Sequence, residues 1–545
     1  MSYSIFERPA IVSKLRSENF DLLVIGGGIT GAGIALDAAS RGLNVALVEK
    51  NDFAFGTSSR STKLIHGGLR YLKQLEFGLV KEVGSERAVV HSLAPHLVVP
   101  EKMLLPLSEK RGMGYWLTSI GLKMYDWLAG VKREDQRRML TRLQTLKQEP
   151  LLRKDDVKGG AIYAEYRTDD ARLTIEIIKT AVQHGATIIS YAIVTDFIYD
   201  NGKISGVKVK DLLTEDLILI QSIMVVNAAG PWVDELREIN KSKEGKTLRL
   251  TKGVHIVVPN KKLPVKQSIY FNVEDGRMIF AIPRGRSTYV GTTDTNYSGD
   301  KNEVFTSHED ALYLISAVNM NFPSAKLTLQ DVESSWAGLR PLIHEEGKSA
   351  SELSRKDEIF ESKTGLISIA GGKLTGYRKM AERVLDLVIE KSFDNRNLKP
   401  CSTSQIKLMQ SSFVGYNDVK TYIDTVAKRL NQLGLSETKA KYLVENYGRQ
   451  TDQILSTLEL KKEFSELSLL MAQLDFCLQN EMICSLQDFL VRRTGLMYFE
   501  INLVKENLLA IGHEMKIKIG WSDKKFDLEL AQINLLIKNI TTFES

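Results

Sequence analysis

The chain has 545 residues, which exceeds the size of one hydrophobic core and predicts roughly two to four structural units. Its hydrophobic fraction of 43% and charged fraction of 26% are those of an ordinary soluble globular protein. The three cysteines, Cys401, Cys477 and Cys484, form neither a disulfide framework nor a paired CxxC site. The sequence therefore predicts no metal centre and suits a reducing cytoplasm.

The N-terminal segment, MSYSIFERPAIVSKLRSENF, shows no targeting signal. It lacks the apolar core of a signal peptide, and it carries Glu7 and Glu18 where a transit peptide would be poor in acids. No stretch of the chain approaches the roughly 18 uninterrupted apolar residues that a membrane-spanning helix needs. We expect a cytoplasmic protein that does not span a bilayer.

The first predicted elements form a strand, helix, strand unit. Residues 20–26 are a short apolar run that breaks at glycine, as a buried parallel strand does. Residues 29–41 are rich in alanine with apolar residues at helical spacing, and residues 43–48 give a second strand that ends before Glu49. A unit of this kind is typical of a doubly wound sheet.

A GxGxxG motif lies at the turn of this unit and predicts a dinucleotide site. Gly26 permits the tight turn, Gly28 lets the backbone approach the pyrophosphate, and Gly31 lets the helix pack on the strand. Glu49 follows Gly31 by 18 positions and is expected to accept hydrogen bonds from the adenosine ribose. The pyrophosphate would lie at the helix N-terminus, beside Ile29 and Thr30.

Residues 110–147 hold a surplus of six positive charges, equal to that of the whole chain. The same window contains aromatic and aliphatic residues, and this combination on amphipathic helices is typical of proteins that lie on anionic membrane surfaces. The alternative is a solvated helix face beside a core helix. No nucleic-acid-binding motif accompanies the charge, so we expect no nucleic-acid partner.

The elements that follow indicate an inserted sheet. Residues 174–186 are predicted to be a helix, and residues 187–200 a strand that turns at Asn201-Gly202. Residues 222–230 and 365–373 are further buried strands, and 246–345 contains alternating strands that predict an antiparallel substrate-side layer.

After about residue 395 the patterns are mostly helical, so the predicted fold class is α/β: a Rossmann-type FAD-binding domain, an inserted antiparallel β-sheet substrate domain and a C-terminal α-helical domain. The predicted parts are FAD-binding segments at 18–90, 161–245 and 346–395, a cap or insert at 91–160 that faces the membrane, the substrate-binding sheet at 246–345 and the helical domain at 396–545.

The dinucleotide is predicted to be FAD. A hydroxyl-rich segment, SSRSTKLIHGGLRYL at residues 58–72, follows Glu49 closely, and another glycine strand closes the unit near residue 371. A flavin that is held permanently along an extended path needs hydrogen-bond donors from such distant parts of the chain. In NAD-binding domains, by contrast, strands and helices usually follow one another without a long intervening segment.

Several segments resemble, in the same order, those of FAD-dependent glycerol-3-phosphate dehydrogenases, within the wider group of D-amino-acid oxidase-like flavoproteins. They are IGGGITGAGIALDAASRG (25–42), SSRSTKLIHGGLRYL (58–72), KGVHIVVP (252–259), GTTDT (291–295), GLRPL (338–342), GGKLTGYRKMA (371–381) and DFLVRRTG (488–495). The resemblance implies oxidation of sn-glycerol 3-phosphate to dihydroxyacetone phosphate by hydride transfer from C2 to flavin N5. It also implies that electrons pass to a membrane quinone from a homodimer at the inner face of the cytoplasmic membrane.

A phosphate dianion beside a flavin needs fixed cationic donors, because guanidinium groups bind its oxygens in bidentate fashion. By resemblance, the substrate contacts are Arg70, Tyr71, Arg340, Arg355 and Lys373. A structural ion pair is the alternative for each of them, and Arg355 has the least support because its surroundings also suit a solvated loop.

A histidine near neutrality is well suited to remove the hydroxyl proton while hydride leaves C2. By resemblance His255 faces the flavin, so it is the first candidate for the base. His66 is the second, because LIHGG would also place it near the flavin ring.

The remaining cofactor contacts are expected in three groups. The hydroxyl-rich segment supplies donors along the phosphates and ribityl chain, and its glycine pair lets the backbone pass close to the ring. The GGKLTG segment returns to the flavin, where Lys373 would stabilise the reduced form. The residues are Thr57, Ser58, Ser59, Ser61, Lys63, Leu64, His66, Gly67 and Gly68, then Val194, Ala229 and Gly230, and then Gly372, Lys373, Leu374 and Thr375.

Three other functions stay open at this stage. A glycerol-3-phosphate oxidase that uses oxygen would need an extra insertion, for which we expect a chain of this length to have no room. A flavoenzyme that oxidises a 2-hydroxy acid or an amine would need one arginine for a carboxylate. A flavin-binding, membrane-associated redox sensor would have no use for a phosphate pocket.

Overall fold

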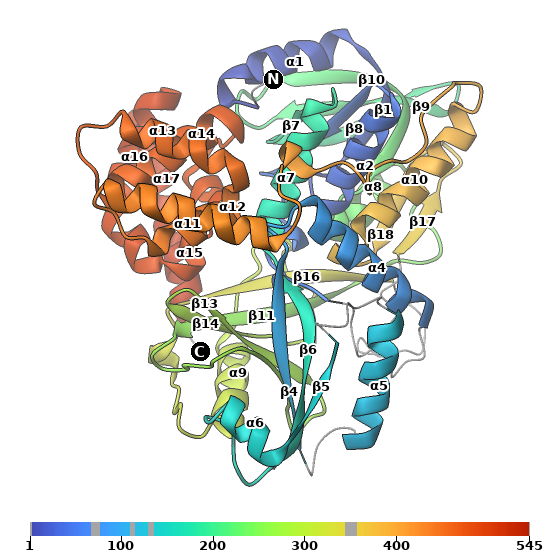
Figure 1. The fold of residues 1–545 in the computed structure, drawn as a ribbon. Coiled ribbons are helices and arrows are strands. Elements are labelled where there is room, and N and C mark those ends of the chain that lie inside the picture. The colour runs from blue at the N-terminus through green and yellow to red at the C-terminus, as the bar shows by residue number, and fades with distance from the viewer. Residues whose placement is uncertain (1–2, 67–76, 109–114, 129–135, 344–356, 544–545) are drawn as a thin grey trace.

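The computed structural model describes residues 3–66, 77–108, 115–128, 136–343 and 357–543. Two β-sheets lie one above the other, and the C-terminal helices pack against one side of both (Figure 1). The predicted α/β architecture with an inserted sheet and a C-terminal helical part is confirmed.

The first sheet has eight strands and a parallel centre, in the order β17-β18-β10-β1-β2-β7. β1 and β2 are buried almost throughout, as the apolar runs predicted, and they pair in parallel from Leu22 with Val45 to Ile25 with Val48. β17 closes one edge in antiparallel orientation, and β8 and β9 extend the sheet from β10. The strands are β1 (Asn19–Ile25), β2 (Val45–Val48), β7 (Thr187–Ile189), β8 (Ala192–Asp200), β9 (Lys203–Asp211), β10 (Leu217–Asn227), β17 (Asp357–Glu361) and β18 (Ile367–Gly371).

Three helices pack together on one face of this sheet: α2 (Ile29–Arg41), α7 (Asp170–Gln183) and α10 (Tyr377–Ser392). Small residues allow the close approach. A Cβ atom added at Gly33 of α2 would lie 2.8 Å from Cδ2 of Tyr377 in α10. The helix α1 (Arg8–Ser17) contacts β10 and β7.

The predicted strand at 187–200 is wrong in one respect, because it is interrupted between β7 and β8. Tyr191 has a positive φ of 56°, and its backbone N–H donates to the carbonyl oxygen of Asn51 instead of continuing a strand ladder. The predicted turn at Asn201-Gly202 is confirmed: both residues have positive φ and connect β8 to β9.

The second sheet has ten strands, and all its recorded pairs are antiparallel except that of β12 with β4. β4 and β5 lie in the segment 91–160 that we expected to be a cap, and β6 begins at its end, yet all three belong to the same sheet as β11–β16. The boundaries of the predicted parts stay a prediction. The strands are β3 (Leu64–Ile65), β4 (Val99–Ser108), β5 (Arg138–Thr141), β6 (Val157–Arg167), β11 (Leu248–Pro259), β12 (Ser268–Asn272), β13 (Met278–Arg284), β14 (Ser287–Gly291), β15 (Thr295–Asn296) and β16 (Ser334–Ile343).

Helices flank this second sheet. α5 (Tyr115–Leu128) and α6 (Arg142–Gln148) both contact β6, and α9 (His308–Asn321) contacts β11. α4 (Phe77–Leu93) connects toward the first sheet and contacts α5. Within the described ranges, no helix has both the length and the apolar character required to cross a membrane.

The C-terminal part is helical, as predicted, and lies at the left of Figure 1. A π-helical turn at Asp488–Arg493 carries the conspicuous arginine pair of the sequence DFLVRRTG. The helices are α11 (Tyr416–Gln432), α12 (Thr438–Tyr447), α13 (Thr451–Glu459), α14 (Glu466–Asn480), α15 (Leu496–Phe499), α16 (Ile501–Ile519) and α17 (Asp523–Thr541).

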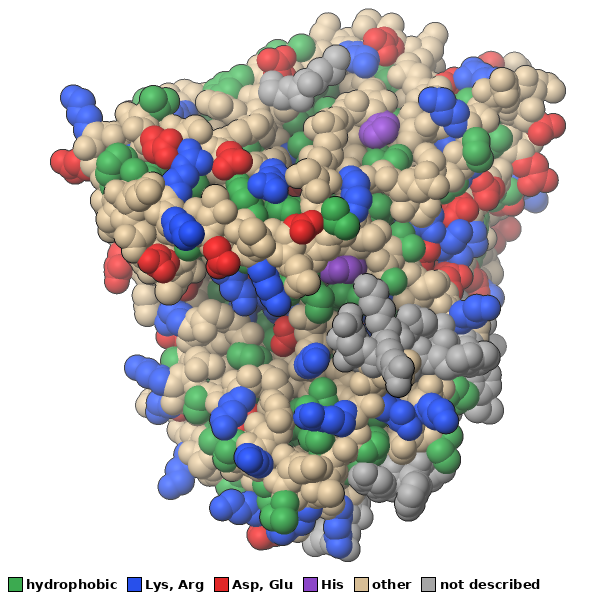
Figure 2. Space-filling view, viewed as in Figure 1, with side chains coloured by type: hydrophobic (Ala, Val, Ile, Leu, Met, Phe, Trp, Pro, Cys, Tyr) green, Lys and Arg blue, Asp and Glu red, His purple; other side chains and the backbone are tan. Residues whose placement is uncertain are grey.

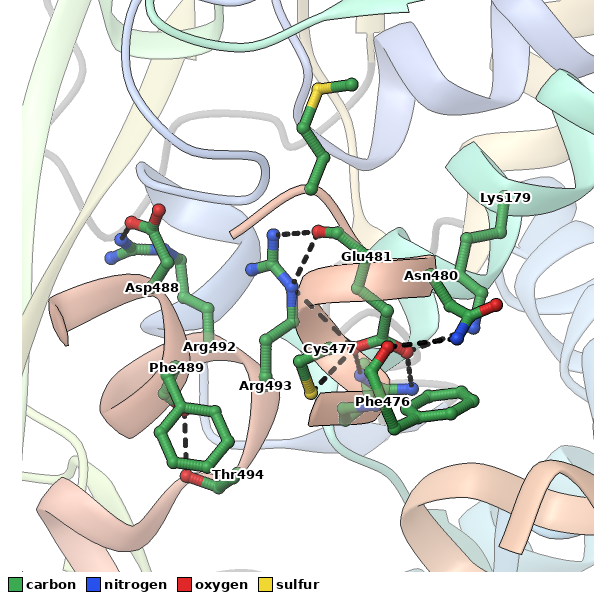
Figure 3. Close-up of polar contacts among 12 residues, drawn as sticks. Lys179, Phe476, Cys477, Asn480, Glu481, Asp488, Phe489, Arg492, Arg493 and Thr494 are labelled. Carbon is green, nitrogen blue, oxygen red and sulfur yellow. Dashed lines mark hydrogen bonds and ion pairs between the residues drawn. The ribbon is translucent and has the colours of Figure 1, made fainter. Parts of the chain in front are cut away.

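Buried ion pairs join this helical part to the first sheet and its helices (Figure 3). Glu481 accepts hydrogen bonds from Arg172 at 2.6 and 2.9 Å and from Lys179 at 2.9 Å, and both donors are on α7. Burial alone would raise the pKa of Glu481, but Arg172 and Lys179 outweigh it and hold that pKa far below its usual value. The interface therefore depends on charge pairing as well as on apolar packing.

Candidate active site

A cavity of about 770 Å³ lies between the two sheets. It reaches from the glycine turn after β1, along the segment 49–66, to the strands β11 and β16 of the second sheet. Its volume lies within the range of ligand and cofactor pockets. Among the described residues, the lining ends at Met380, so the C-terminal helices contribute no wall to the cavity.

The glycine turn has the geometry that the motif predicts. Gly26 has φ of 113°, and a Cβ atom added at Gly31 would lie only 1.9 Å from the carbonyl oxygen of Gly26. Gly28 is the N-cap of α2, and the N–H of Ile29 donates to Oγ of Ser58 at 2.9 Å. The N-terminus of α2 thus lines the cavity with a positive dipole end, which favours a bound pyrophosphate.

Glu49 is partly buried and joins the turn after β1 to the segment that follows β2. One carboxylate oxygen accepts from the N–H of Gly27 at 2.6 Å, and the other accepts from the N–H of Asn51 at 2.8 Å. Burial raises the pKa of Glu49, and these two hydrogen bonds oppose the shift. Each oxygen keeps a second lone pair, so the same carboxylate is able to accept from the hydroxyls of a ribose.

Thr57 and Ser58 line the cavity, but Ser59 and Lys63 do not. The Lys63 ammonium donates to Oδ1 of Asp170 at 2.5 Å and to the carbonyl oxygen of Ser59 at 3.2 Å, beneath the cavity wall. The side chain of Lys63 therefore holds the loop in place, and any contact of Lys63 with a cofactor would come from its backbone. Thr57 fixes the other side of the loop, because its hydroxyl donates to the carbonyl oxygen of Leu339.

Gly31, like Ser59 and Lys63, is packed away from the cavity. Five predicted site residues, Gly67, Gly68, Arg70, Tyr71 and Arg355, lie outside the described residues. The structure brings the remaining predicted residues to one cavity: Gly26, Gly28, Ile29, Thr30, Glu49, Thr57, Ser58, Ser61, Leu64, His66, Val194, Ala229, Gly230, His255, Arg340, Gly372, Lys373, Leu374 and Thr375.

His255 lies on β11 and is almost completely buried. Its ring stacks on the indole of Trp336 at 4.7 Å, and its Nε2 is 2.9 Å from the hydroxyl oxygen of Thr62. Nδ1 has no hydrogen-bond partner among the described residues. Burial, followed by the charges of Arg340 and Lys63, lowers the pKa of His255 well below its usual value, so the imidazole is neutral at neutral pH.

Arg340 lies on β16, which pairs with β11, and its guanidinium is held in one orientation. It donates to the carbonyl oxygen of Thr293 at 3.0 Å, to the carboxylate of Asp294 at 3.1 Å and to the hydroxyl of Thr292 at 2.9 Å. A Cβ atom added at Gly253 of β11 would lie 2.4 Å from Nη2 of Arg340, so only glycine leaves room for the guanidinium there. The turn that follows β14 thus orients a cation at the cavity.

His66 and Lys373 approach the same cavity from other segments. His66 follows β3, and its ring centroid is 6.1 Å from that of Phe280. Lys373 follows β18 and precedes the short helical turn at Leu374–Gly376. Gly372 has φ of 79°, which lets the chain turn sharply at the cavity wall.

Two residues that organise this site were not predicted. Trp336 supplies the surface on which His255 stacks, and Asp170 at the start of α7 holds both Lys63 and the N–H of Ser61. The only sequence signal for Asp170 is its place in an acidic pair before a helical pattern, which reads first as a helix cap. Trp336 has no separate signal, because it reads as an ordinary strand residue.

Comparison with known proteins identifies the family. A family model described as FAD dependent oxidoreductase matches residues 21–378, and one described as the C-terminal domain of alpha-glycerophosphate oxidase matches residues 401–526. The chain belongs to the FAD dependent oxidoreductase family. The glycine turn, the helix N-terminus and Glu49 fit this cofactor, because they provide backbone donors for its phosphates and an acceptor for its ribose.

Curated members of the FAD dependent oxidoreductase family resemble the whole chain. A protein of Bacillus subtilis named aerobic glycerol-3-phosphate dehydrogenase is 47% identical over 98% of both chains. One of the same name from Staphylococcus aureus is 48% identical over 99% of this chain and 98% of its own. The solved structure of a glycerol-3-phosphate dehydrogenase from Bacillus halodurans, complexed with FAD, is 44% identical, covers 99% of both chains and has a TM-score of 0.85.

We predict that Gly31→Ala prevents stable FAD binding, because the added methyl group would displace the carbonyl of Gly26 and open the cradle. The purified variant should retain less than about a tenth of the wild-type flavin content, measured by visible absorbance against protein concentration. Gly78→Ala in α4 is the matched control, since no atom of the described residues lies within 4 Å of its added Cβ. Equal flavin content in the two variants would contradict the packing argument.

Proposed function

We propose that this protein oxidises sn-glycerol 3-phosphate at C2 to give dihydroxyacetone phosphate. The observation that carries the proposal is the pairing of β11 with β16, which places a neutral imidazole and an oriented guanidinium at the same cavity. The substrate is supported by the names of relatives that match this chain over almost its full length.

The phosphate of the substrate binds Arg340 and Lys373 in this proposal. A planar guanidinium accommodates two phosphate oxygens, and the hydrogen bonds of Arg340 to Thr292, Thr293 and Asp294 fix its direction before the substrate arrives. Asp294 offsets part of the charge of Arg340, which limits the cost of keeping a cation here without substrate. Arg70, Tyr71 and Arg355 belong to the same proposed set on the basis of the resemblance.

His255 acts as the base. FAD, when bound, supplies the acceptor for the hydride that leaves C2. His255 takes the proton of the C2 hydroxyl in this proposal, since the lowered pKa keeps its ring unprotonated and Thr62, which holds Nε2, lines the same cavity. Stacking on Trp336 holds the plane of the imidazole during this transfer.

We further propose that electrons leave to a membrane quinone and that the protein works as a homodimer on the inner face of the cytoplasmic membrane. The surface that supports membrane binding in this proposal belongs to the second sheet and its helices. Ile120 of α5 and Leu143 of α6 are 62% and 77% exposed, and the exposed residues Arg138, Arg142 and Lys147 lie near Leu143 in the sequence. The lower part of the view in Figure 2 shows many basic side chains and few acidic ones, as a surface for anionic lipids requires.

Arg340→Lys should raise KM for glycerol 3-phosphate by about tenfold or more, with a smaller effect on kcat, because lysine keeps the charge but loses bidentate binding. Steady-state kinetics with an artificial electron acceptor measure both constants. Arg286→Lys is the control, since Arg286 pairs with Glu333 and Glu500 outside the cavity. An unchanged KM for Arg340→Lys would remove Arg340 from the substrate site.

His255→Gln should retain bound flavin and lower kcat by about 10² to 10⁴, which is the usual contribution of a general base. His66→Gln should lower kcat only a few-fold, because His66 is assigned no proton transfer. Rapid-mixing measurement of flavin reduction separates this step from the later passage of electrons. The reverse order of the two effects would assign the base to His66.

A further inference from the structure

The segment 49–58 lies between the cofactor cavity and the C-terminal helices. Residues 49–51 and 55–58 line the cavity, residues 52–54 between them do not, and no described residue beyond Met380 does so. Any influence of the C-terminal helices on the cofactor must therefore pass through intervening residues. The contacts on the two sides of this segment trace such a connection.

On its inner side the segment is fastened to the glycine turn. The carboxylate of Glu49 accepts from the N–H of Gly27 at 2.6 Å, and the N–H of Ala54 donates to the carbonyl oxygen of Gly27 at 3.0 Å. The ring of Phe53 packs against the same residue, because a Cβ atom added at Gly27 would lie 2.7 Å from Cδ1 of Phe53. The turn and the segment are thus held as one unit.

On its outer side the segment is fastened to the C-terminal helices through Asp52. The carboxylate accepts from both terminal nitrogens of Arg493, at 2.7 and 2.8 Å, and from Nε of Arg492 at 2.5 Å. Asp52 and Arg493 are fully buried, and Arg492 is 2% exposed. Figure 3 shows the two arginines leaving the same π-helical turn in different directions.

A second connection runs beside the first. Arg492 also donates to Asp488 at 2.8 Å, and Asp488 accepts from the hydroxyl of Tyr191 at 2.6 Å. The backbone N–H of Tyr191 donates to the carbonyl oxygen of Asn51, the neighbour of Asp52. Asn51 and Asp52 are therefore both connected to the π-helical turn by hydrogen bonds.

The charge balance makes this connection strong. Burial alone would raise the pKa of the Asp52 carboxyl, but Arg493 and Arg492 outweigh burial and hold that pKa below its usual value. A buried carboxylate that loses a paired arginine is left without compensation, so the loop that carries it would move to reach water.

We propose that Arg493 and Arg492 are positioning residues for the cofactor: through Asp52 they hold the segment 49–54 against the glycine turn and so slow the release of FAD. This inference rests on FAD occupying the cavity, and it does not depend on the substrate. It gives the C-terminal helical part a role in cofactor retention, although that part lies outside the cavity wall.

The same interface contains a matched control. Arg172 forms a buried bidentate pair with Glu481 across the junction of α7 and the C-terminal helices, as Arg493 does with Asp52. Its other bonds go to Glu176 and to the carbonyl oxygen of Asn446, so it makes no hydrogen bond to the segment 49–58. The two arginines meet at Glu481, whose carbonyl oxygen accepts from Arg493 at 2.8 Å, so a general loss of stability at the interface affects both variants, whereas only Arg493 binds Asp52 in the segment 49–58.

The test compares holoprotein carrying Arg493→Lys or Arg172→Lys. After dilution into buffer without FAD, the rise of free flavin fluorescence gives the rate of FAD release, and thermal unfolding gives Tm. Lysine keeps the charge and loses bidentate geometry. We expect both variants to lower Tm, with FAD release at least about tenfold faster in Arg493→Lys and within about twofold of wild type in Arg172→Lys.

Two more variants complete the test. Arg492→Lys, which disturbs one hydrogen bond to Asp52, should accelerate release less than Arg493→Lys and serves if that variant does not fold. Asp52→Asn should accelerate release, and the double variant with Arg493→Lys should be no faster than the faster single variant. The proposal would be overturned if FAD release became faster in proportion to the loss of Tm in both the Arg172 and the Arg493 variant. It would also be overturned if the release rate stayed at the wild-type value.

Discussion

The cofactor site depends on the hydrogen bonds that the carboxylate of Glu49 accepts. Glu49 ends the second strand of the first sheet, and the N–H of Gly27 that it binds belongs to the turn after the first strand. This contact closes the cradle around the N-terminus of α2. Burial of part of this side chain raises the pKa of Glu49, and the two donors oppose that shift and connect the end of the strand to the glycine turn.

The reactive end of the cavity depends on a different constraint, the pairing of β11 with β16. Glycines at 253 and 291 leave the space in which Arg340 and His255 lie, since a Cβ atom added at Gly253 would lie 2.4 Å from Nη2 of Arg340 and one added at Gly291 would lie 2.1 Å from Cδ2 of His255. The first sheet thus provides the cofactor cradle and the second provides the groups that act on substrate. The segment 49–66 connects the two, with its loop clamped by Lys63 and Asp170.

Local patterns predicted the parts of this protein that local physics determines. The glycine turn, α2 and the first two strands follow from sequence periodicity, and His255, Arg340 and Lys373 were found through a family resemblance. The interruption at Tyr191 and the role of Lys63 were not predictable in this way. Their partners, Asn51 and Asp170, lie about 140 and 107 positions away, and single-sequence patterns carry no information on such pairs.

Anaerobic addition of sn-glycerol 3-phosphate to the purified yellow protein, with the visible flavin absorbance recorded, tests the proposed function directly. We expect full bleaching, with dihydroxyacetone phosphate formed in equal amount to the flavin reduced. Glycerol without phosphate should give little bleaching, because it has no group for Arg340 to bind. An unbleached flavin with glycerol 3-phosphate would contradict the proposed function.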